Sequence, residues 1–213
     1  MNVLEFDSIE LSFNGRQILK NIFIQCNTGK ITGLLGRNGA GKSCLMQVVF
    51  GGLQAQYKSV RFNGTYLQKQ IIAYLPQTKL LPSYISLSQA LKLFQVQPLS
   101  ITEYFPEINL IINKKPDEIS TGELRVFEVL LILNSRHPFC FLDEPFSGLS
   151  PVMIDRLKSY ILLKKQYKGI LISDHLHQHV TGICDEIFVL SAGQSYRVKS
   201  KADLIGRGYL PEV

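Results

Sequence analysis

Residues 36–43 read GRNGAGKS and fit the phosphate-binding pattern G-x-x-x-x-G-K-[ST]. The apolar run at 30–35 before them predicts a buried strand, and residues 44–50 after them can continue as a helix. In such a strand, loop and helix unit, backbone N–H groups and the helix N-terminus form a cradle for an anionic polyphosphate. Lys42 can reach the outer phosphates, and the Ser43 hydroxyl can take a coordination position on magnesium. The alternative is a glycine-rich turn that matches the pattern by chance.

Length and composition bound the class of protein. A phosphate loop indicates that the protein binds a nucleotide but does not reveal which reaction the nucleotide serves, because kinases, GTPases and many ATPases share the loop. The 213 residues with 46% hydrophobic content suit one sizeable core or two closely packed lobes. A net charge of +6 fits nucleotide binding, an anionic membrane surface or plain solubility. No apolar run approaches the roughly 20 residues of a membrane span, and residues 1–5 lack signal-peptide features. We therefore expect a protein that stays in the cytosol.

The four cysteines show neither C-x-x-C pairing nor metal-ligand spacing. We therefore expect buried, reduced thiols at Cys26, Cys44, Cys140 and Cys184. Cys44 falls in the first turn after the phosphate loop, where a helix dipole can lower the pKa of a thiol. We favour packing as its role.

Hydrophobic patterning divides the chain into three regions. Rough alternation over the first 30 residues and an Asn-Gly turn at 14–15 indicate antiparallel strands. From about 80 to 133 strand signals are few, and apolar residues at i, i+3, i+4 and i+7 spacing over 87–94 predict an amphipathic helix. The second half reads as alternating strands and helices. Further strands are predicted at 60–62, 71–75, 139–142, 170–172 and 187–190, and a further helix at 152–167.

A second chemical signal stands at residues 139–144, which read FCFLDE. Four apolar residues predict a central strand, and its carboxyl end delivers Asp143 and Glu144 to the sheet edge where α/β proteins bind ligands. Asp143 is suited to hold magnesium, directly or through water, and Glu144 can act on the attacking water. The alternative is a strand that ends in a polar turn capped by Pro145.

Five motifs now follow one another: the phosphate loop, Gln77 in YLPQ, STGE at 120–123, LDEP at 142–145 and His175 in ISDH. Their order and spacing resemble the nucleotide-binding domain of ATP-binding cassette (ABC) ATPases over nearly the whole chain. The resemblance implies an α/β fold with a P-loop NTPase core and an N-terminal antiparallel β layer. It also implies a single domain over 1–213 with a helical subdomain inserted at about 79–135.

The resemblance further implies ATP as the nucleotide and Mg²⁺ as the cofactor. Phe13 matches the aromatic ring that stacks on adenine; the alternative is a strand residue in the core. Gln77 would reach the metal and the water through its amide oxygen; the alternative is a surface loop residue. The implied metal-binding residues are Ser43, Gln77 and Asp143, and the implied ATP-binding residues are Phe13, Gly36, Arg37, Asn38, Gly39, Ala40, Gly41, Lys42, Ser43 and Cys44.

The implied catalytic residues are Glu144, His175 and Gln77. His175 follows an apolar strand and matches the histidine that contacts the γ-phosphate and orients the water; the alternative is an ordinary polar loop histidine. His177 and His179 complete an alternating run that could suggest a metal site. No carboxylate or cysteine set completes a coordination sphere around it, so we do not expect one.

Residues 120–123 look like a divergent form of the family signature LSGGQ, with Ile119 for the leucine, Thr121 for the first glycine and Glu123 for the glutamine. The same segment is a capping box before the helical run 124–133, so we expect Glu123 to secure the helix start. In the family this segment faces the ATP of the opposite subunit. The implied signature residues are Ser120, Thr121, Gly122 and Glu123.

The loop that touches the partner subunit in the family corresponds to 147–150, where Ser150 stands for the usual aspartate. Ser150 and Pro151 form a good N-cap and first-turn pair. Local structure is therefore expected to persist, while communication across the dimer is expected to differ.

The implied function is that of an ATPase subunit that powers a membrane ABC transporter with separate transmembrane subunits. Two copies, or a paired cassette, would bind head to tail. The surface around Gln77 and the helical block would receive a short helix from the transmembrane partner, which would hold the protein at the inner face of the cell membrane. No nucleic acid is expected. The alternatives are a soluble ABC ATPase acting on ribosomes or DNA and an ATP-binding regulator without turnover. The transported substrate and its direction belong to the partner chains.

Overall fold

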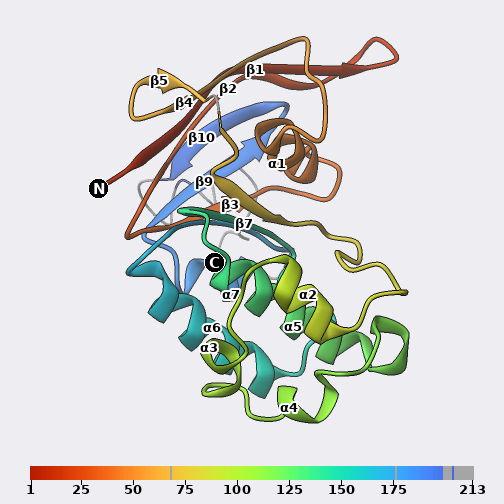
Figure 1. Cartoon of the computed structure of the whole chain (residues 1–213). Helices are drawn as coiled ribbons and strands as arrows, with labels where there is room; N and C mark the ends of the chain where they lie inside the picture. Colours follow the sequence, from red (N-terminus) through yellow and green to blue (C-terminus); the bar gives the residue numbers. More distant parts are fainter. Residues whose placement is uncertain (68, 176, 199–202, 204–213) are drawn as a thin grey trace.

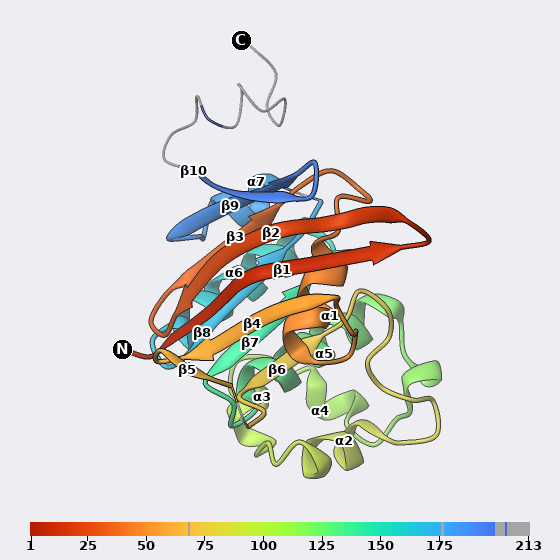
Figure 2. The same ribbon diagram turned by 90° about the horizontal axis from the view of Figure 1, so that it is seen from above.

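The computed structural model describes residues 1–67, 69–175, 177–198 and 203. They form an antiparallel sheet, a mostly parallel central sheet and a block of helices beyond it (Figure 1). Seen from above, the long antiparallel strands cross over the central sheet (Figure 2). The predicted fold class, an α/β core with an N-terminal antiparallel layer, is confirmed.

The antiparallel sheet has the strand order β2-β1-β4-β5. Its strands are β1 (Val3–Phe13), β2 (Arg16–Asn27), β4 (Tyr57–Phe62) and β5 (Thr65–Tyr66). Both predicted Asn-Gly turns join neighbouring strands. Asn14 and Gly15 have φ angles of 49° and 78°, and Asn63 and Gly64 have 49° and 82°, the left-handed pair that a two-residue hairpin requires.

The central sheet has the order β10-β9-β3-β8-β7-β6. All neighbours pair in parallel except β10, which is antiparallel to β9. The predicted buried strands are confirmed, whereas β10 was missed because its residues are only partly buried and give no apolar run. The strands are β3 (Ile31–Leu35), β6 (Ile72–Leu75), β7 (Phe139–Asp143), β8 (Gly169–Ser173), β9 (Glu186–Ser191) and β10 (Gln194–Val198).

Helices occupy both faces of the central sheet. Helix α1 (Lys42–Phe50) packs between the two sheets, and α5 (Thr121–Asn134) and α6 (Pro151–Lys165) cover the opposite face. Residues 79–135 are all described and contain helices and turns without a strand, although the boundary of a subdomain there stays a prediction. The shorter elements are α2 (Leu87–Leu93), α3 (Leu99–Thr102), α4 (Ile108–Ile111), η1 (Pro116–Glu118) and α7 (His177–Thr181).

Alternation along the buried strands builds two separate cores. On β7, Phe139 and Phe141 face the antiparallel sheet and α1, whereas Cys140 and Leu142 face α5 and α6. Because successive side chains of a strand point to opposite faces, a strand that is apolar throughout anchors both layers. The phosphate loop and the helices beyond the sheet are thereby fixed to one rigid scaffold.

The cysteines depart in part from expectation. Cys26 and Cys140 are buried, but Cys44 and Cys184 are only partly buried, and all four are free thiols. Cys44 lines a surface cavity, which explains its exposure. Burial, with the charge of Asp143 as a second cause, raises the pKa of Cys44. The pKa of Cys44 is therefore raised and not lowered, because burial outweighs the effects that favour the thiolate.

Candidate functional site

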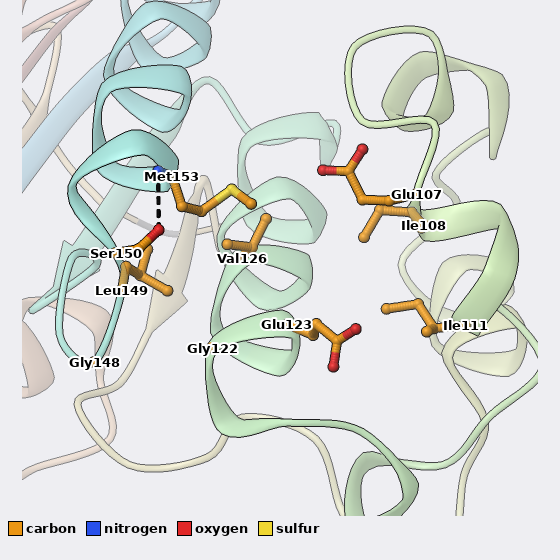
Figure 3. A pocket seen from close by; sticks show the side chains of 10 residues that line it. All are labelled: Glu107, Ile108, Ile111, Gly122, Glu123, Val126, Gly148, Leu149, Ser150 and Met153. Atoms are coloured by element: carbon orange, nitrogen blue, oxygen red, sulfur yellow. Dashed lines mark hydrogen bonds between the residues drawn. The ribbon is translucent and has the colours of Figure 1, made fainter.

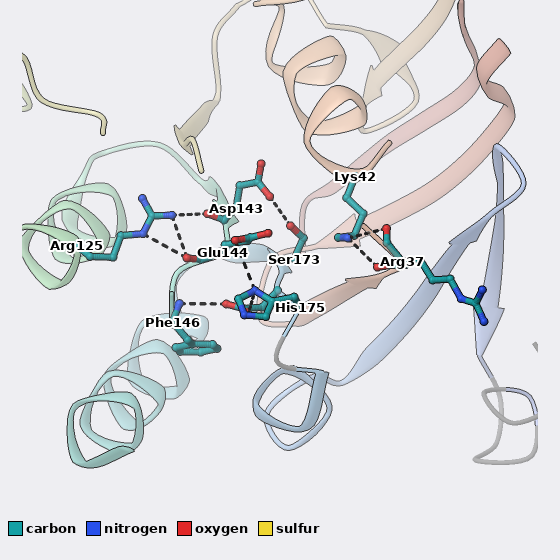
Figure 4. Close-up of polar contacts among 10 residues, drawn as sticks. Arg37, Lys42, Arg125, Asp143, Glu144, Phe146, Ser173 and His175 are labelled. Atoms are coloured by element: carbon teal, nitrogen blue, oxygen red, sulfur yellow. Dashed lines mark hydrogen bonds and ion pairs between the residues drawn. The ribbon is translucent and has the colours of Figure 1, made fainter. Parts of the chain in front are cut away.

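Four neighbouring parallel strands end at one edge of the central sheet. Strand β3 leads into the phosphate loop, β6 into Gln77, β7 into Glu144 and β8 into His175. Because the strands run in the same direction, their carboxyl ends deliver these segments to a common place. Figure 4 shows Lys42, Asp143, Glu144 and His175 gathered there.

An open surface cavity lined by residues from all four of these segments lies at this edge. Phe13 contributes from the end of β1 with an exposed fraction of 44%, so its alternative role as a core residue is wrong. Ile18 was not predicted; it sits at the start of β2 against the loop. The lining residues are Phe13, Ile18, Asn38, Gly39, Gly41, Lys42, Ser43, Cys44, Gln77, Glu144 and His175.

The phosphate loop needs its glycines for close approach and for unusual backbone angles. A Cβ atom at Gly36 would lie 2.8 Å from the carbonyl oxygen of Leu190. Gly41 has a φ of 102°, in the region that L side chains rarely adopt. Residues 37–40 close a turn in which the Ala40 N–H donates to the Arg37 carbonyl at 3.0 Å. The backbone is therefore curved as a phosphate cradle requires.

Lys42 is held inside this loop. Its ammonium group donates to the carbonyl oxygens of Gly36 at 2.7 Å and Arg37 at 3.3 Å. Burial lowers the pKa of Lys42, although the charges of Asp143, Glu144 and Asp174 act in the opposite direction. The side chain thus lies beside the carboxylate cluster and along the loop that would surround a phosphate.

Asp143 is almost fully buried at the end of β7. The Ser173 hydroxyl donates to its Oδ1 at 2.5 Å, and the Tyr74 hydroxyl lies 3.3 Å from its Oδ2. These two hydroxyl groups fix the orientation of the carboxylate. Carboxylates that bind metals are commonly oriented by such hydrogen bonds. Burial, followed by the charge of Asp143, raises the pKa of Tyr74, which keeps this phenol a donor.

Glu144 has a φ of 53°, a left-handed conformation that is uncommon for a residue with a side chain. Its N–H donates to the Ser173 carbonyl at 2.7 Å, which holds the turn. The carboxylate Oε2 lies 3.6 Å from His175 Nδ1, and Asp174 Oδ1 lies 3.4 Å from the same nitrogen. Figure 4 shows the Glu144 and His175 side chains next to each other. Two groups that can transfer protons, one after β7 and one after β8, therefore lie close together.

The donor set fits magnesium. The residues expected to hold the metal carry oxygen atoms, which a hard cation such as Mg²⁺ prefers. The Ser43 hydroxyl and the Gln77 amide belong to residues that line the cavity, whereas Asp143 is buried and is not among the lining residues. The described residues contain no cluster of three or more His, Cys, Asp or Glu side chains suited to a metal. At the histidine run, His179 instead packs edge-on against Phe146, with ring centroids 6.0 Å apart.

The signature segment lies in a different place. A second cavity lies among the start of α5, helix α4 and the loop at 148–150 (Figure 3). Gly122 and Glu123 line it, and an atom added at Gly122 would meet the Gly148 carbonyl at 3.6 Å. Within one chain, the structure therefore does not bring the signature segment into the cavity of the phosphate loop.

The predicted helix caps are confirmed. Glu123 Oε2 accepts hydrogen bonds from the N–H of Ser120 at 2.9 Å and from its hydroxyl at 2.7 Å, while Ser120 Oγ accepts from the Glu123 N–H at 3.2 Å. These bonds lower the pKa of Glu123. Ser150 Oγ accepts from the Met153 N–H at 3.4 Å, with Pro151 in the first turn.

Several residues of this region escaped prediction. Ser173 and Tyr74 orient Asp143, and Asp174 accepts a hydrogen bond from the Phe146 N–H at 3.1 Å. Arg125 reaches the same edge from α5. The first two look like ordinary strand residues in the sequence. Arg125 does leave a signal, since it is a charge inside the apolar run 124–133.

Comparison with known proteins decides the family. A family model described as ABC transporter matches residues 19–147, which is more than half of the chain. The chain belongs to the ABC transporter family. The matched segment begins in β2 and ends just beyond Glu144, so it includes the phosphate loop, Gln77, the signature segment and the β7 carboxylates.

Individual relatives of this chain are ATP-binding proteins of ABC transporters. The lipopolysaccharide export system ATP-binding protein LptB of Haemophilus influenzae is 27% identical over 91% of this chain and 89% of its own length. The high-affinity branched-chain amino acid transport ATP-binding protein BraG of Pseudomonas aeruginosa is 25% identical over 90% of each chain. A solved ATP-binding subunit of an ABC transporter superimposes with a TM-score of 0.82 at 23% identity, over 99% of this chain and 95% of that one, and supports the fold.

This chain is therefore an ATPase subunit of an ABC transporter, which couples ATP hydrolysis to transport. The comparisons give no support to the alternative of a soluble ABC ATPase on ribosomes or DNA. Within the described residues, no helix is both long enough and apolar enough to cross a membrane.

Proposed function

We propose that this ATPase binds Mg²⁺-ATP in the cavity at the carboxyl edge of the central sheet and hydrolyses it between two copies of the chain. The observation that carries the proposal is the gathering of the phosphate loop, Gln77, Glu144 and His175 around one cavity. These groups come from four strands, and together they cover phosphate binding, metal binding and proton transfer.

Each residue has a role that its position supports. The half-exposed ring of Phe13 stacks on adenine at the rim. The backbone from Gly36 to Ser43 cradles the phosphates, and Lys42 turns its ammonium group from the loop carbonyls to the outer phosphates. Glu144 takes a proton from the attacking water, and His175, beside it, orients that water and the γ-phosphate.

Ser43, Gln77 and Asp143 would hold the magnesium ion, which supplies charge compensation for the phosphates when it is bound. The hydroxyl donors on Asp143 keep its carboxylate aimed in one direction. Gln77 follows β6, the strand next to β7. A shift of the segment after β6 would therefore move the Gln77 amide away from the magnesium ion.

The position of the signature segment supports the need for a second copy. Gly122 and Glu123, at the start of α5, line the second cavity beside the loop at 148–150, and none of Ser120 to Glu123 lines the phosphate cavity of its own chain. The capped N-terminus of α5, where Ser120 and Thr121 are exposed, has the positive dipole end that suits a γ-phosphate. In a head-to-tail pair, Ser120 and Gly122 of one copy close the site of the other.

Separate transmembrane subunits complete the transporter in this proposal and hold the ATPase at the inner face of the membrane. The experiment is to express the tagged chain with and without a candidate ABC permease, and to follow both membrane fractionation and Mg²⁺-dependent ATPase activity. We expect membrane association only with the partner, and ATP hydrolysis by the purified chain. Stable sedimentation with ribosomes or DNA would contradict the transporter assignment. ATP binding without turnover would favour the regulatory alternative.

A further inference from the structure

Arg125 is a buried cation that the hydrolysis mechanism does not use directly. It lies in the second turn of α5 with an exposed fraction of 7%. Its guanidinium group leaves the helix and points at the carboxyl edge of the central sheet (Figure 4). Burying a guanidinium is unfavourable unless its donors are paired, so its partners indicate what it is for.

Those partners are backbone carbonyls of the candidate site. Nη1 donates to the Pro76 carbonyl at 2.9 Å, and Nη2 donates to the carbonyls of Asp143 and, at 3.0 Å, Glu144. Nε lies 3.3 Å from the same Glu144 oxygen. A single side chain therefore joins the peptide before Gln77 to the peptides of the metal-binding and base residues.

The contact with Glu144 bears on its conformation. The left-handed backbone of Glu144 persists only if its surroundings hold it. Its N–H is fixed by the Ser173 carbonyl at 2.7 Å, and its carbonyl is fixed by Arg125. These two bonds orient both peptides that flank the Glu144 Cα atom, and so they set the direction in which the carboxylate leaves the chain.

Glu128 extends the same arrangement one turn further along α5. Its Oε2 lies 3.5 Å from Arg125 Nη1, and its Oε1 accepts hydrogen bonds from the N–H groups of Leu80 at 2.7 Å and Leu81 at 3.1 Å. The segment that carries Gln77 is thus tied to α5 on both sides, at Pro76 and at 80–81. Buried ion pairs contribute little to folding stability, and a packed apolar pair would contribute as much. Stability alone therefore does not account for the Arg125–Glu128 pair.

We propose that Arg125 is a positioning residue for ATP hydrolysis: through three backbone carbonyls it holds the Glu144 carboxylate and the Gln77 amide in register with the phosphate loop. The inference rests on the proposed function, in which Glu144 is the base. It assigns Arg125 an effect on the chemical step and little effect on ATP binding.

The test compares Arg125→Lys with Arg156→Lys. Lysine keeps the charge, but its ammonium group cannot span three carbonyls as the guanidinium does. Arg156 is a matched control because it also binds a carboxylate, Glu107, and a backbone carbonyl, Tyr104, yet touches none of the site residues. We expect Arg125→Lys to lower kcat at least about tenfold, as misplaced reacting groups do. KM for ATP should stay within about threefold, and Arg156→Lys should leave both unchanged.

A double-mutant cycle separates positioning from general damage. In a Glu144→Gln background the base is absent and only the Gln77 amide is left to position, so Arg125→Lys should lower the residual turnover by a smaller factor than in the wild-type background, and ATP binding should persist. A second variant, Arg125→Met combined with Glu128→Gln, removes both charges and keeps an acceptor for the N–H groups of 80–81. It should fold and still lose kcat.

Three results would overturn the inference: wild-type kcat in Arg125→Lys, an equal loss in both backgrounds, or a fall in ATP affinity that matches the fall in kcat. A wild-type protein that does not hydrolyse ATP would instead overturn the proposed function, and this inference with it. Because the wild-type chain and Arg156→Lys are assayed together, the two failures are distinguishable.

Discussion

The Lys42 ammonium group donates to the Gly36 carbonyl oxygen at 2.7 Å and so spans the phosphate loop from its seventh residue to its first. The carbonyl groups of the loop therefore pair with the lysine ammonium group. A polyphosphate must offer oxygens that replace these carbonyls, and it can do so because charged acceptors form stronger hydrogen bonds with an ammonium group than neutral ones.

Lys42→Ala should abolish most ATP hydrolysis and weaken ATP binding while the fold persists. The substitution deletes the cation nearest the outer phosphates but leaves the backbone cradle, and loss of one such stabilising donor lowers kcat by about 10²–10³-fold. Turnover, binding of a fluorescent ATP analogue and thermal unfolding would be measured beside Lys92→Ala, an exposed lysine on α2. Wild-type turnover in Lys42→Ala would exclude the loop from the mechanism.

Glu144→Gln should bind ATP, hydrolyse it very slowly and accumulate as an ATP-bound dimer. The amide keeps the shape of the side chain and loses the basicity that takes a proton from water, an effect of about 10²–10⁴-fold. Size-exclusion chromatography with Mg²⁺ and either ATP or ADP would report the dimer, with ADP as the control. A variant that stays monomeric with ATP would contradict the head-to-tail arrangement, and one with wild-type turnover would contradict the base.

Substitutions at Gly122 test whether the signature segment of one copy completes the site of the other. Gly122→Asp places a negative charge at the N-terminus of α5, facing the γ-phosphate of the partner copy, whereas Gly122→Ala adds one atom that meets its neighbours at ordinary distances of 3.6 and 3.7 Å. Gly122→Asp should lose turnover and Gly122→Ala should keep most of it.

A mixed dimer of Gly122→Asp with Lys42→Ala contains one site in which both the phosphate loop and the signature segment are intact. We therefore expect the mixture to recover part of the wild-type rate, measured after unfolding and refolding the two chains together. If each chain hydrolyses ATP by itself, no mixture would exceed the sum of its components.

ATP binding at alkaline pH should take up protons. Burial lowers the pKa of Lys42 in the free protein, and bound phosphates raise it again. The affinity for ATP should therefore fall as the pH rises from this lowered pKa toward that of the complex. Calorimetry in buffers of different ionisation enthalpy counts the protons. Lys42→Arg is the control, because arginine stays charged and should show no uptake; equal uptake in both proteins would assign the proton to another group.

Features that depend on contacts between near neighbours could be predicted from the sequence alone. The turns at 14–15 and 63–64, the caps at Ser120 and Ser150, and the strand, loop and helix around residues 36–43 all follow from side chains within a few positions of one another. The order of the five motifs was enough to indicate the family. The roles of individual site residues stay predictions.

Which of these segments meet depends on the order of the strands and on the packing of the layers. The strand order β3-β8-β7-β6 brings the phosphate loop, His175, Glu144 and Gln77 to one edge, and no local pattern encodes which strands become neighbours. The same packing separates Ser120 to Glu123 from that cavity and turns Arg125, a charge in an apolar helix, toward the Glu144 carbonyl. Such long-range contacts depend on how the apolar faces of the sheets and helices pack against one another. A buried charge must be paired, and the packing of these layers decides which backbone groups lie close enough to pair with it.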